Sequence, residues 1–112
     1  MNSMIKLYIL NDEGEKVFGE GPFRLLKATA ELGSLRKAAL SMDMAYSKAR
    51  KLLVTAEEAF GTPLVVPTIG GKSGGGSKLT DEATNLLAKY EIYRKRCKEA
   101  NSQIYEEVFG KQ

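Results

Sequence analysis

Between residues 22 and 61 the hydrophobic positions recur at helical spacing in three runs, which predict three helices. Pro22 suits the first turn of the first helix, and Gly33 is a typical helix-ending residue. Ser34 is a favourable N-cap for a short second helix. The buried side of that second helix is expected to carry Leu35, Ala38, Ala39 and Met42. Its alanine pair would let another helix approach closely.

The third helix is predicted over about residues 45–60, and a tight break at residues 41–44 separates it from the second. Within the break, Asp43 tolerates a left-handed backbone better than most residues do. One side of the third helix is apolar: Ala49, Leu52, Leu53, Ala56 and Phe60. The opposite side is polar and basic near its N-terminal end: Tyr46, Ser47, Arg50 and Lys51. Two helices joined in this way are typical of a helix-turn-helix.

Strand-forming segments flank the three helices. Residues 4–10 and 16–19 predict a β-hairpin around a turn at residues 11–14. Because an isolated hairpin is marginally stable, it must pack on the helices. After the third helix, residues 63–67 predict a short strand bracketed by prolines, followed by a glycine-rich loop over residues 70–78 that contains two lysines. With a short return strand this loop indicates a wing, although a flexible linker is an alternative interpretation.

A long last helix is predicted from an N-cap at Thr80 to about Phe109, with acidic residues in its first turn. A seam along it has the 4-3-4-3-4 spacing of a heptad pattern: Leu86, Tyr90, Tyr93, Cys97, Ala100 and Ile104. The seam could pack on its own domain. Because a small domain offers little surface beyond Tyr90, the pattern favours a partner helix, and we expect a homodimer.

The predicted fold is α+β and mainly α: a winged helix-turn-helix with an N-terminal β-hairpin and a long C-terminal dimerisation helix. We expect one domain over residues 1–112. It would comprise a hairpin over residues 1–20, three helices over residues 21–61, a wing over residues 62–80 and a last helix over residues 80–109.

Composition narrows the function mainly by exclusion. The chain has 112 residues, 43% of them hydrophobic and 28% charged, which suits one globular domain. It has no apolar run of the length that a membrane span needs and no export signal, and its single cysteine fits a reducing compartment, so we expect a cytoplasmic protein. The sequence contains no histidine, the usual general base and commonest metal ligand. We expect no enzyme, no metal and no cofactor.

The charge is unevenly placed along the chain. The net charge is −1 over residues 1–32, +4 over residues 33–78 and zero over residues 79–112. A positive middle third fits either a nucleic-acid footprint or an ordinary basic surface. The glycine-rich loop is not a phosphate-binding P-loop. That motif requires a glycine five residues before Gly71, where Val66 stands.

Three stretches of the chain carry a family resemblance: Gly33–Ala39, Met44–Ala49 and Gly70–Thr80. They resemble the DNA-binding domain of the molybdate-responsive ModE regulators, which is close in architecture to the LysR-type helix-turn-helix. The opening hairpin and Val17–Gly21 also resemble the start of the short, stand-alone members. The resemblance covers nearly the whole chain, and its most specific part is the glycine-rich wing.

The resemblance implies a transcriptional regulator that binds double-stranded DNA sequence-specifically. Because a two-fold dimer would present two recognition helices to two half-sites, we expect the DNA site to be an inverted repeat. It implies that base edges are read by Tyr46, Ser47, Arg50 and Lys51. It implies that phosphates are met by Ser34, Arg36, Lys37, Lys48, Lys72 and Lys78. A winged-helix protein–protein interaction module without DNA affinity is the alternative. After the wing the 112 residues provide a single helix, so we expect no molybdate-binding domain.

Four residues depart from the family pattern. Asp43 stands where glycine is usual and Ala45 where a serine N-cap is usual, which would loosen the turn. Arg50 stands where tryptophan is common, and Pro67 replaces a basic residue before the wing. The last two move charge from the wing to the third helix, so the DNA sequence preference of the family cannot be transferred.

Overall fold

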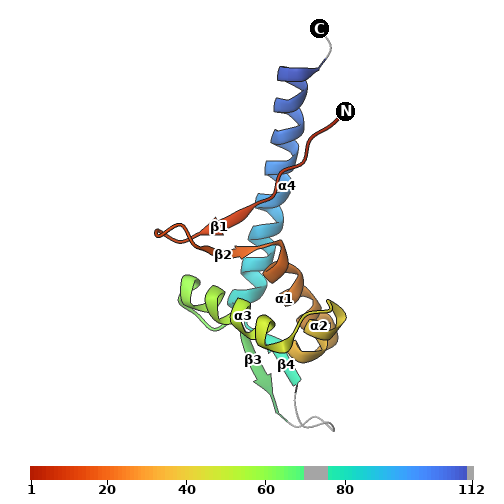
Figure 1. Cartoon of the computed structure of the whole chain (residues 1–112). Helices are drawn as coiled ribbons and strands as arrows, with labels where there is room; N and C mark the ends of the chain where they lie inside the picture. The colour runs from red at the N-terminus through yellow and green to blue at the C-terminus, as the bar shows by residue number, and fades with distance from the viewer. Residues whose placement is uncertain (70–75, 111–112) are drawn as a thin grey trace.

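Two small hairpins and a long helix surround a three-helix body (Figure 1). This computed structural model describes residues 1–69 and 76–110. The elements are, in order, β1 (Tyr8–Leu10), β2 (Lys16–Gly19), α1 (Glu20–Leu32), α2 (Leu35–Ser41), α3 (Tyr46–Phe60), β3 (Val65–Thr68), β4 (Gly76–Leu79) and α4 (Asp81–Phe109). The predicted winged helix-turn-helix is confirmed.

The helix ends follow local capping chemistry. Gly33 closes α1 with a left-handed φ of 70°, which glycine adopts without steric cost. Ser34 begins α2, and its Oγ accepts a hydrogen bond from the backbone N–H of Lys37 at 3.1 Å. Thr80 begins α4 in the same way, accepting from the N–H of Ala83 at 3.1 Å. The two predicted N-caps are therefore confirmed.

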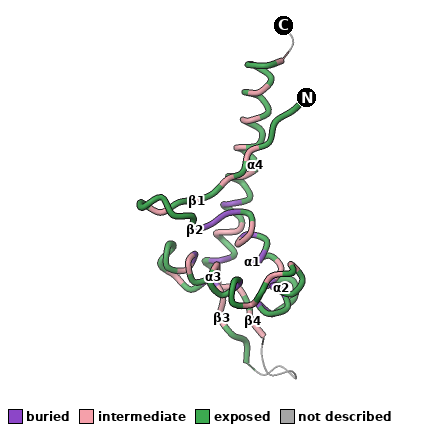
Figure 2. The backbone as a smooth tube through the Cα atoms, in the orientation of Figure 1, coloured by how far each residue is buried: buried purple, intermediate pink, exposed green. Residues whose placement is uncertain are grey.

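The core lies where α1, α2 and α3 meet β2 and the first turns of α4 (Figure 2). Its buried side chains are Phe18, Phe23, Leu25, Leu26, Leu35, Ala38, Ala39, Ala49, Leu53, Ala56, Leu64, Ala83 and Tyr90. Phe60 was expected on the apolar side of α3, but it is 38% exposed near the end of that helix, where its ring packs edge-on against Phe18.

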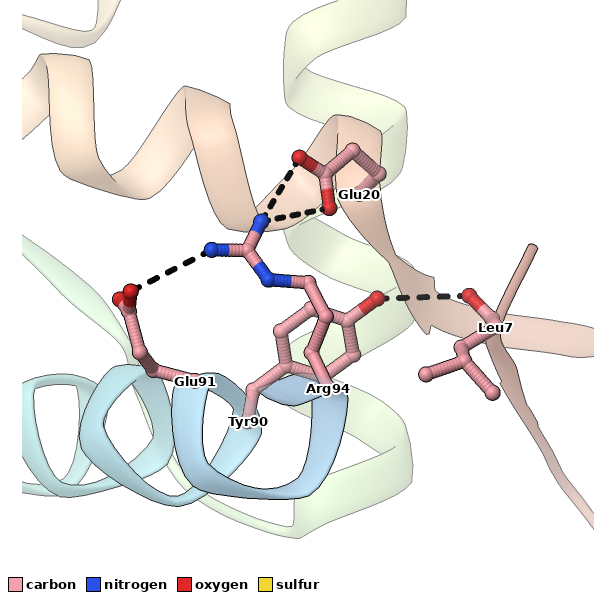
Figure 3. A network of polar contacts seen from close by, with 5 residues as sticks. All are labelled: Leu7, Glu20, Tyr90, Glu91 and Arg94. Atoms are coloured by element: carbon pink, nitrogen blue, oxygen red, sulfur yellow. Dashed lines mark hydrogen bonds and ion pairs between the residues drawn. The ribbon is translucent and has the colours of Figure 1, made fainter. Parts of the chain in front are cut away.

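Tyr90 attaches α4 to the body and is 2% exposed. Its ring lies 5.1 Å from the ring of Phe18 and 5.1 Å from that of Phe23, measured between centroids. The hydroxyl group donates to the carbonyl of Leu7 at 3.3 Å (Figure 3). The expectation that Tyr90 belongs to a dimer seam is therefore wrong. The heptad spacing is the same whether a helix covers its own core or a partner.

An ion pair beside Tyr90 ties α4 to the start of α1. Nη1 of Arg94 lies 2.9 Å from each carboxylate oxygen of Glu20, and Nη2 lies 3.3 Å from Glu91 (Figure 3). Burial, with the Glu20 carboxylate as a second cause, raises the pKa of Tyr90 above its usual value. Both effects favour the protonated hydroxyl, which is the form that donates to the Leu7 carbonyl.

The first strand is shorter than predicted, since it begins at Tyr8 instead of Met4. Tyr8 pairs with Gly19, the last residue of β2. The pairing stops there because the chain turns into α1 at the next residue. The residues before Tyr8 have no strand to pair with, and they run beside α4 (Figure 1). Nδ2 of Asn101 donates to Oγ of Ser3 at 2.9 Å and fixes this segment on the helix.

The strands β3 and β4 pair antiparallel, from Val65 opposite Leu79 to Thr68 opposite Gly76. Pro67 was expected to end the strand predicted over residues 63–67, but it lies within β3, opposite Ser77. The N–H of Ser77 points away from β3, toward Gly33. Pro67 and Ser77 therefore form a non-hydrogen-bonded pair, in which the backbone N–H group of neither residue points toward the other strand. A proline at this position removes no hydrogen bond between β3 and β4.

The helix α4 has 29 residues, so it is about 43 Å long. The molecule measures 63 × 29 × 24 Å, and the distal half of α4 extends beyond the body (Figure 2). No helix among the described residues is long and apolar enough to cross a membrane.

Candidate nucleic-acid interface

The turn between α2 and α3 reverses the chain through one left-handed residue, Asp43, with a φ of 52°. The N–H of Met44 then donates to the carbonyl of Ala39 at 2.9 Å, which closes the turn on α2. The expected left-handed conformation at Asp43 is confirmed. Glycine would occupy this position without the steric cost that a Cβ atom imposes.

The first turn of α3 lacks a side-chain cap, because Ala45 occupies the N-cap position with extended backbone angles. We expect Ala45→Ser to raise the free energy of unfolding by about 1 kcal/mol, since a serine there accepts a hydrogen bond from a free N–H of α3. Urea denaturation measures this change. Ala59→Ser is the matched control, because it adds the same hydroxyl at an exposed position near the end of the helix. Equal effects of the two substitutions would contradict the capping explanation.

The outward face of α3 is basic. Ser47, Lys48, Arg50 and Lys51 are all exposed, as the prediction requires. Tyr46 differs from them, because it is half-buried against the core. The guanidinium group of Arg36 lies 4.0 Å from the centre of the Tyr46 ring, so this tyrosine connects the starts of α2 and α3. Nothing in the sequence pattern indicated this pair.

The start of α2 holds three of the expected phosphate contacts. Arg36 and Lys37 are exposed. Ser34 is 9% exposed, and its oxygen already accepts from the N–H of Lys37. Capping is therefore the role that the structure gives Ser34, and its contact with phosphate stays a prediction.

The wing is fixed to the helix-turn-helix by backbone contacts that the sequence did not reveal. The N–H of Ser77 donates to the carbonyl of Gly33, at the junction of α1 and α2, at 2.9 Å. A Cβ atom on Gly76 would lie 3.0 Å from the same carbonyl and would collide with Thr68, so glycine allows this close approach. Lys78 is exposed on β4. Lys72, expected to meet phosphate, lies outside the described residues.

A carboxylate of α3 anchors the other strand of the wing. Oε2 of Glu57 accepts hydrogen bonds from the N–H of Leu64 at 2.7 Å and from that of Val65 at 3.4 Å. The start of α2, the outward face of α3 and the wing thus belong to one connected unit. Across residues 1–69 and 76–110, the ion pairs all involve Arg94, so the basic side chains of this unit have no carboxylate partner there.

Comparison with known proteins agrees with this geometry. The sequence profile of the bacterial regulatory helix-turn-helix proteins of the lysR family matches residues 22–84, which is more than half of the chain and runs from the first turn of α1 through β4. The chain belongs to the LysR-type helix-turn-helix family. The match begins at Pro22 and ends in the first turn of α4, so it leaves out the β1–β2 hairpin and most of α4.

Within this LysR-type family, the chain is similar to ModE regulators. It is 38% identical over 74 residues to a molybdenum transport protein ModE of Herbaspirillum seropedicae, covering 66% of the chain and 28% of that protein. It is 34% identical over 90 residues to the ModE protein of Azotobacter vinelandii, covering 78% and 33%. The chain thus matches about a third or less of the length of these relatives. The expected ModE-like helix-turn-helix is confirmed.

A solved structure supports the fold. The crystal structure of ArgP from Mycobacterium tuberculosis matches with a TM-score of 0.55 at 22% sequence identity, covering 80% of this chain and 31% of that protein. At this identity the likeness concerns the arrangement of the helices and strands alone.

Proposed function

We propose that this LysR-type protein binds double-stranded DNA sequence-specifically, as a dimeric transcriptional regulator. The observation that carries the proposal is the basic, exposed face of α3 beside the wing and the start of α2, in a ModE-like helix-turn-helix. One relative, 36% identical over 69 residues, is named transcriptional regulator ModE in Haemophilus influenzae. The proposal rests on the winged helix and includes no molybdate binding.

Base recognition would come from α3 in the major groove, entering with its N-terminal end. Arg50 and Lys51 are exposed and have the chemistry to donate to the O6 and N7 atoms of guanine. Ser47 is one turn closer to the helix start, where it would reach a neighbouring base. Because Tyr46 is half-buried, it presents less of its side chain to a base edge than these three.

Phosphate contacts would position the protein without selecting a sequence. Lys37, Lys48 and Lys78 are exposed and supply point charges, and Lys72, between β3 and β4 in the sequence, would add another. Arg36 is stacked on Tyr46, which orients its guanidinium group before binding. A planar guanidinium held in this way loses little freedom when it pairs with a phosphate.

Dimerisation would use the exposed part of the heptad seam on α4. Leu86 is half-buried against its own core, and Tyr90 is part of that core. Further along, Tyr93 is 47% and Ile104 is 57% exposed, and Cys97 and Ala100 lie between them on the same side of the helix. A two-fold pair formed there would present two α3 helices to two half-sites, hence an inverted repeat.

Selection of bound duplexes from a random pool tests the DNA-binding proposal. We expect Arg50→Ala and Lys51→Ala each to relax the selected consensus, at a cost of about 1–3 kcal/mol on the preferred site. Lys78→Ala is expected to weaken binding to all duplexes alike. It should also lower the slope of log affinity against log salt concentration by about one unit.

Lys95→Ala on α4 is the matched control, because it removes a charge away from the proposed interface. An unchanged consensus in both α3 variants would contradict base reading by α3. Absence of any salt-dependent duplex affinity in the intact chain would favour the protein-interaction module instead.

A further inference from the structure

A cavity of about 520 Å³ lies between the β1–β2 hairpin and α3. Its walls are largely apolar and include Tyr8 and Val17 of the hairpin, Pro22 of α1 and Leu52 of α3. The ring of Tyr8 packs on Gly19, the residue opposite it in the hairpin, where a Cβ atom would come within 3.0 Å of the ring. A cavity of this volume with apolar walls is typical of a site for a small organic ligand.

Three lysines surround the cavity, and they come from two separate elements. Lys16 belongs to β2, whereas Lys48 and Lys51 belong to α3. No acidic residue lines the cavity, and none of the three lysines forms an ion pair within the described part of the chain. Nζ of Lys16 lies 4.1 Å from the centre of the Tyr8 ring, so one positive charge is held directly above the aromatic wall.

We propose that this cavity binds a small amphipathic anion. An aromatic or branched apolar group would occupy the space between Tyr8, Val17 and Leu52, and a carboxylate, sulfonate or phosphate group would meet the lysines. The apolar walls would bury the apolar group of the ligand. The lysines would select a negatively charged ligand, since positive groups with no carboxylate nearby attract an anion.

Occupancy of the cavity would also oppose DNA binding. This step rests on the proposed function, because Lys48 and Lys51 lie on the face of α3 that would contact DNA. An anion paired with either lysine competes with the phosphates or base edges that the same side chain would otherwise reach. By thermodynamic linkage, DNA lowers the affinity for the anion by the same factor by which the anion lowers the affinity for DNA.

Titration of the 112-residue chain with 1-naphthoate, followed by NMR, tests the site in the absence of DNA. We expect amide shifts to concentrate on β1, β2 and the middle of α3. The neutral analogue 1-naphthylmethanol should bind at least about threefold more weakly, because it lacks the charge. Shifts centred on α4, or equal affinities for the two compounds, would overturn the proposal.

Two substitutions locate the site. Lys16→Gln should weaken naphthoate binding about threefold, as expected for loss of one partly solvated ion pair, whereas Lys95→Gln on α4 should leave it unchanged. Thr55→Phe should abolish binding by filling the cavity from α3, and the spectrum of the free variant reports whether it folds. An unchanged naphthoate affinity in Lys16→Gln, or in a folded Thr55→Phe variant, would overturn the assignment.

A separate measurement with DNA tests the coupling. We expect saturating naphthoate to weaken binding to a random duplex at least threefold, and 1-naphthylmethanol to have no such effect. Naphthoate binding without any effect on the duplex would overturn the competition but leave the site. Because the NMR titration contains no DNA, failure of the DNA-binding proposal is distinguishable from failure of the ligand site.

Discussion

Tyr90→Ala is expected to lower the free energy of unfolding by about 3–5 kcal/mol, the usual range for removing a large buried aromatic side chain. Tyr90 fills the space between β2, α1 and α4, and it contacts Phe18 edge-to-face. Its loss leaves a cavity at the junction where α4 and the hairpin meet the body, and it frees the carbonyl of Leu7. Urea denaturation at several protein concentrations measures the effect and separates it from dimerisation.

Tyr93→Ala is the matched control for Tyr90→Ala. Tyr93 is three residues further along α4 and is exposed, so its truncation should cost less than about 1 kcal/mol in the isolated monomer. Tyr90→Phe separates the hydroxyl from the ring, and it should cost about 0.5–1.5 kcal/mol for one lost hydrogen bond. If Tyr90→Ala were as mild as Tyr93→Ala, the assignment of Tyr90 to the core would be wrong.

Ile104→Glu is expected to produce a folded monomer and to reduce affinity for an inverted-repeat operator by about 100-fold or more. Ile104 is exposed on α4 beyond the body, so the substitution leaves the core intact. In the proposed dimer it places two carboxylates in an apolar seam. A monomer contacts one half-site only, so it loses the increase in DNA affinity of about 10²–10⁴-fold that comes from binding two linked half-sites.

Gln103→Glu is the control for Ile104→Glu, because it adds the same charge at the neighbouring, exposed position outside the seam. Sedimentation gives the mass of each variant, and fluorescence anisotropy gives the operator affinity. An intact chain that sediments as a monomer, or an Ile104→Glu variant that still dimerises, would contradict a dimer formed through this seam.

Local signals in the sequence predicted much of the fold. Ser34 and Thr80 marked helix starts because their side chains cap free N–H groups, and Gly33 marked a helix end because α1 closes in a left-handed conformation. Asp43 marked the turn because aspartate tolerates a left-handed backbone better than most residues do. Each of these features depends on a few neighbouring residues, so it is visible without knowledge of the tertiary structure.

Features that depend on distant residues could not be predicted in this way. The spacing of Tyr90 suits a partner helix and a core equally well, and only the positions of Phe18 and Phe23 decide between them. The stacking of Arg36 on Tyr46 and the hydrogen bond from Ser77 to Gly33 also depend on how separate elements pack, so the local sequence did not predict them. The exposed basic residues of α3 were placed correctly because amphipathic periodicity fixes which face of a helix is buried.

The contacts between the two ends of the chain have a consequence for folding. The bond from Tyr90 to Leu7 joins residues 83 apart, and that from Asn101 to Ser3 joins residues 98 apart. Closing such long loops is entropically costly before other contacts form, and the two-stranded hairpin is marginal without them. Synthesis proceeds from the N-terminus, so the β1–β2 hairpin is made before α4. We expect Ser3 and Leu7 to reach their native positions only after α4 has formed.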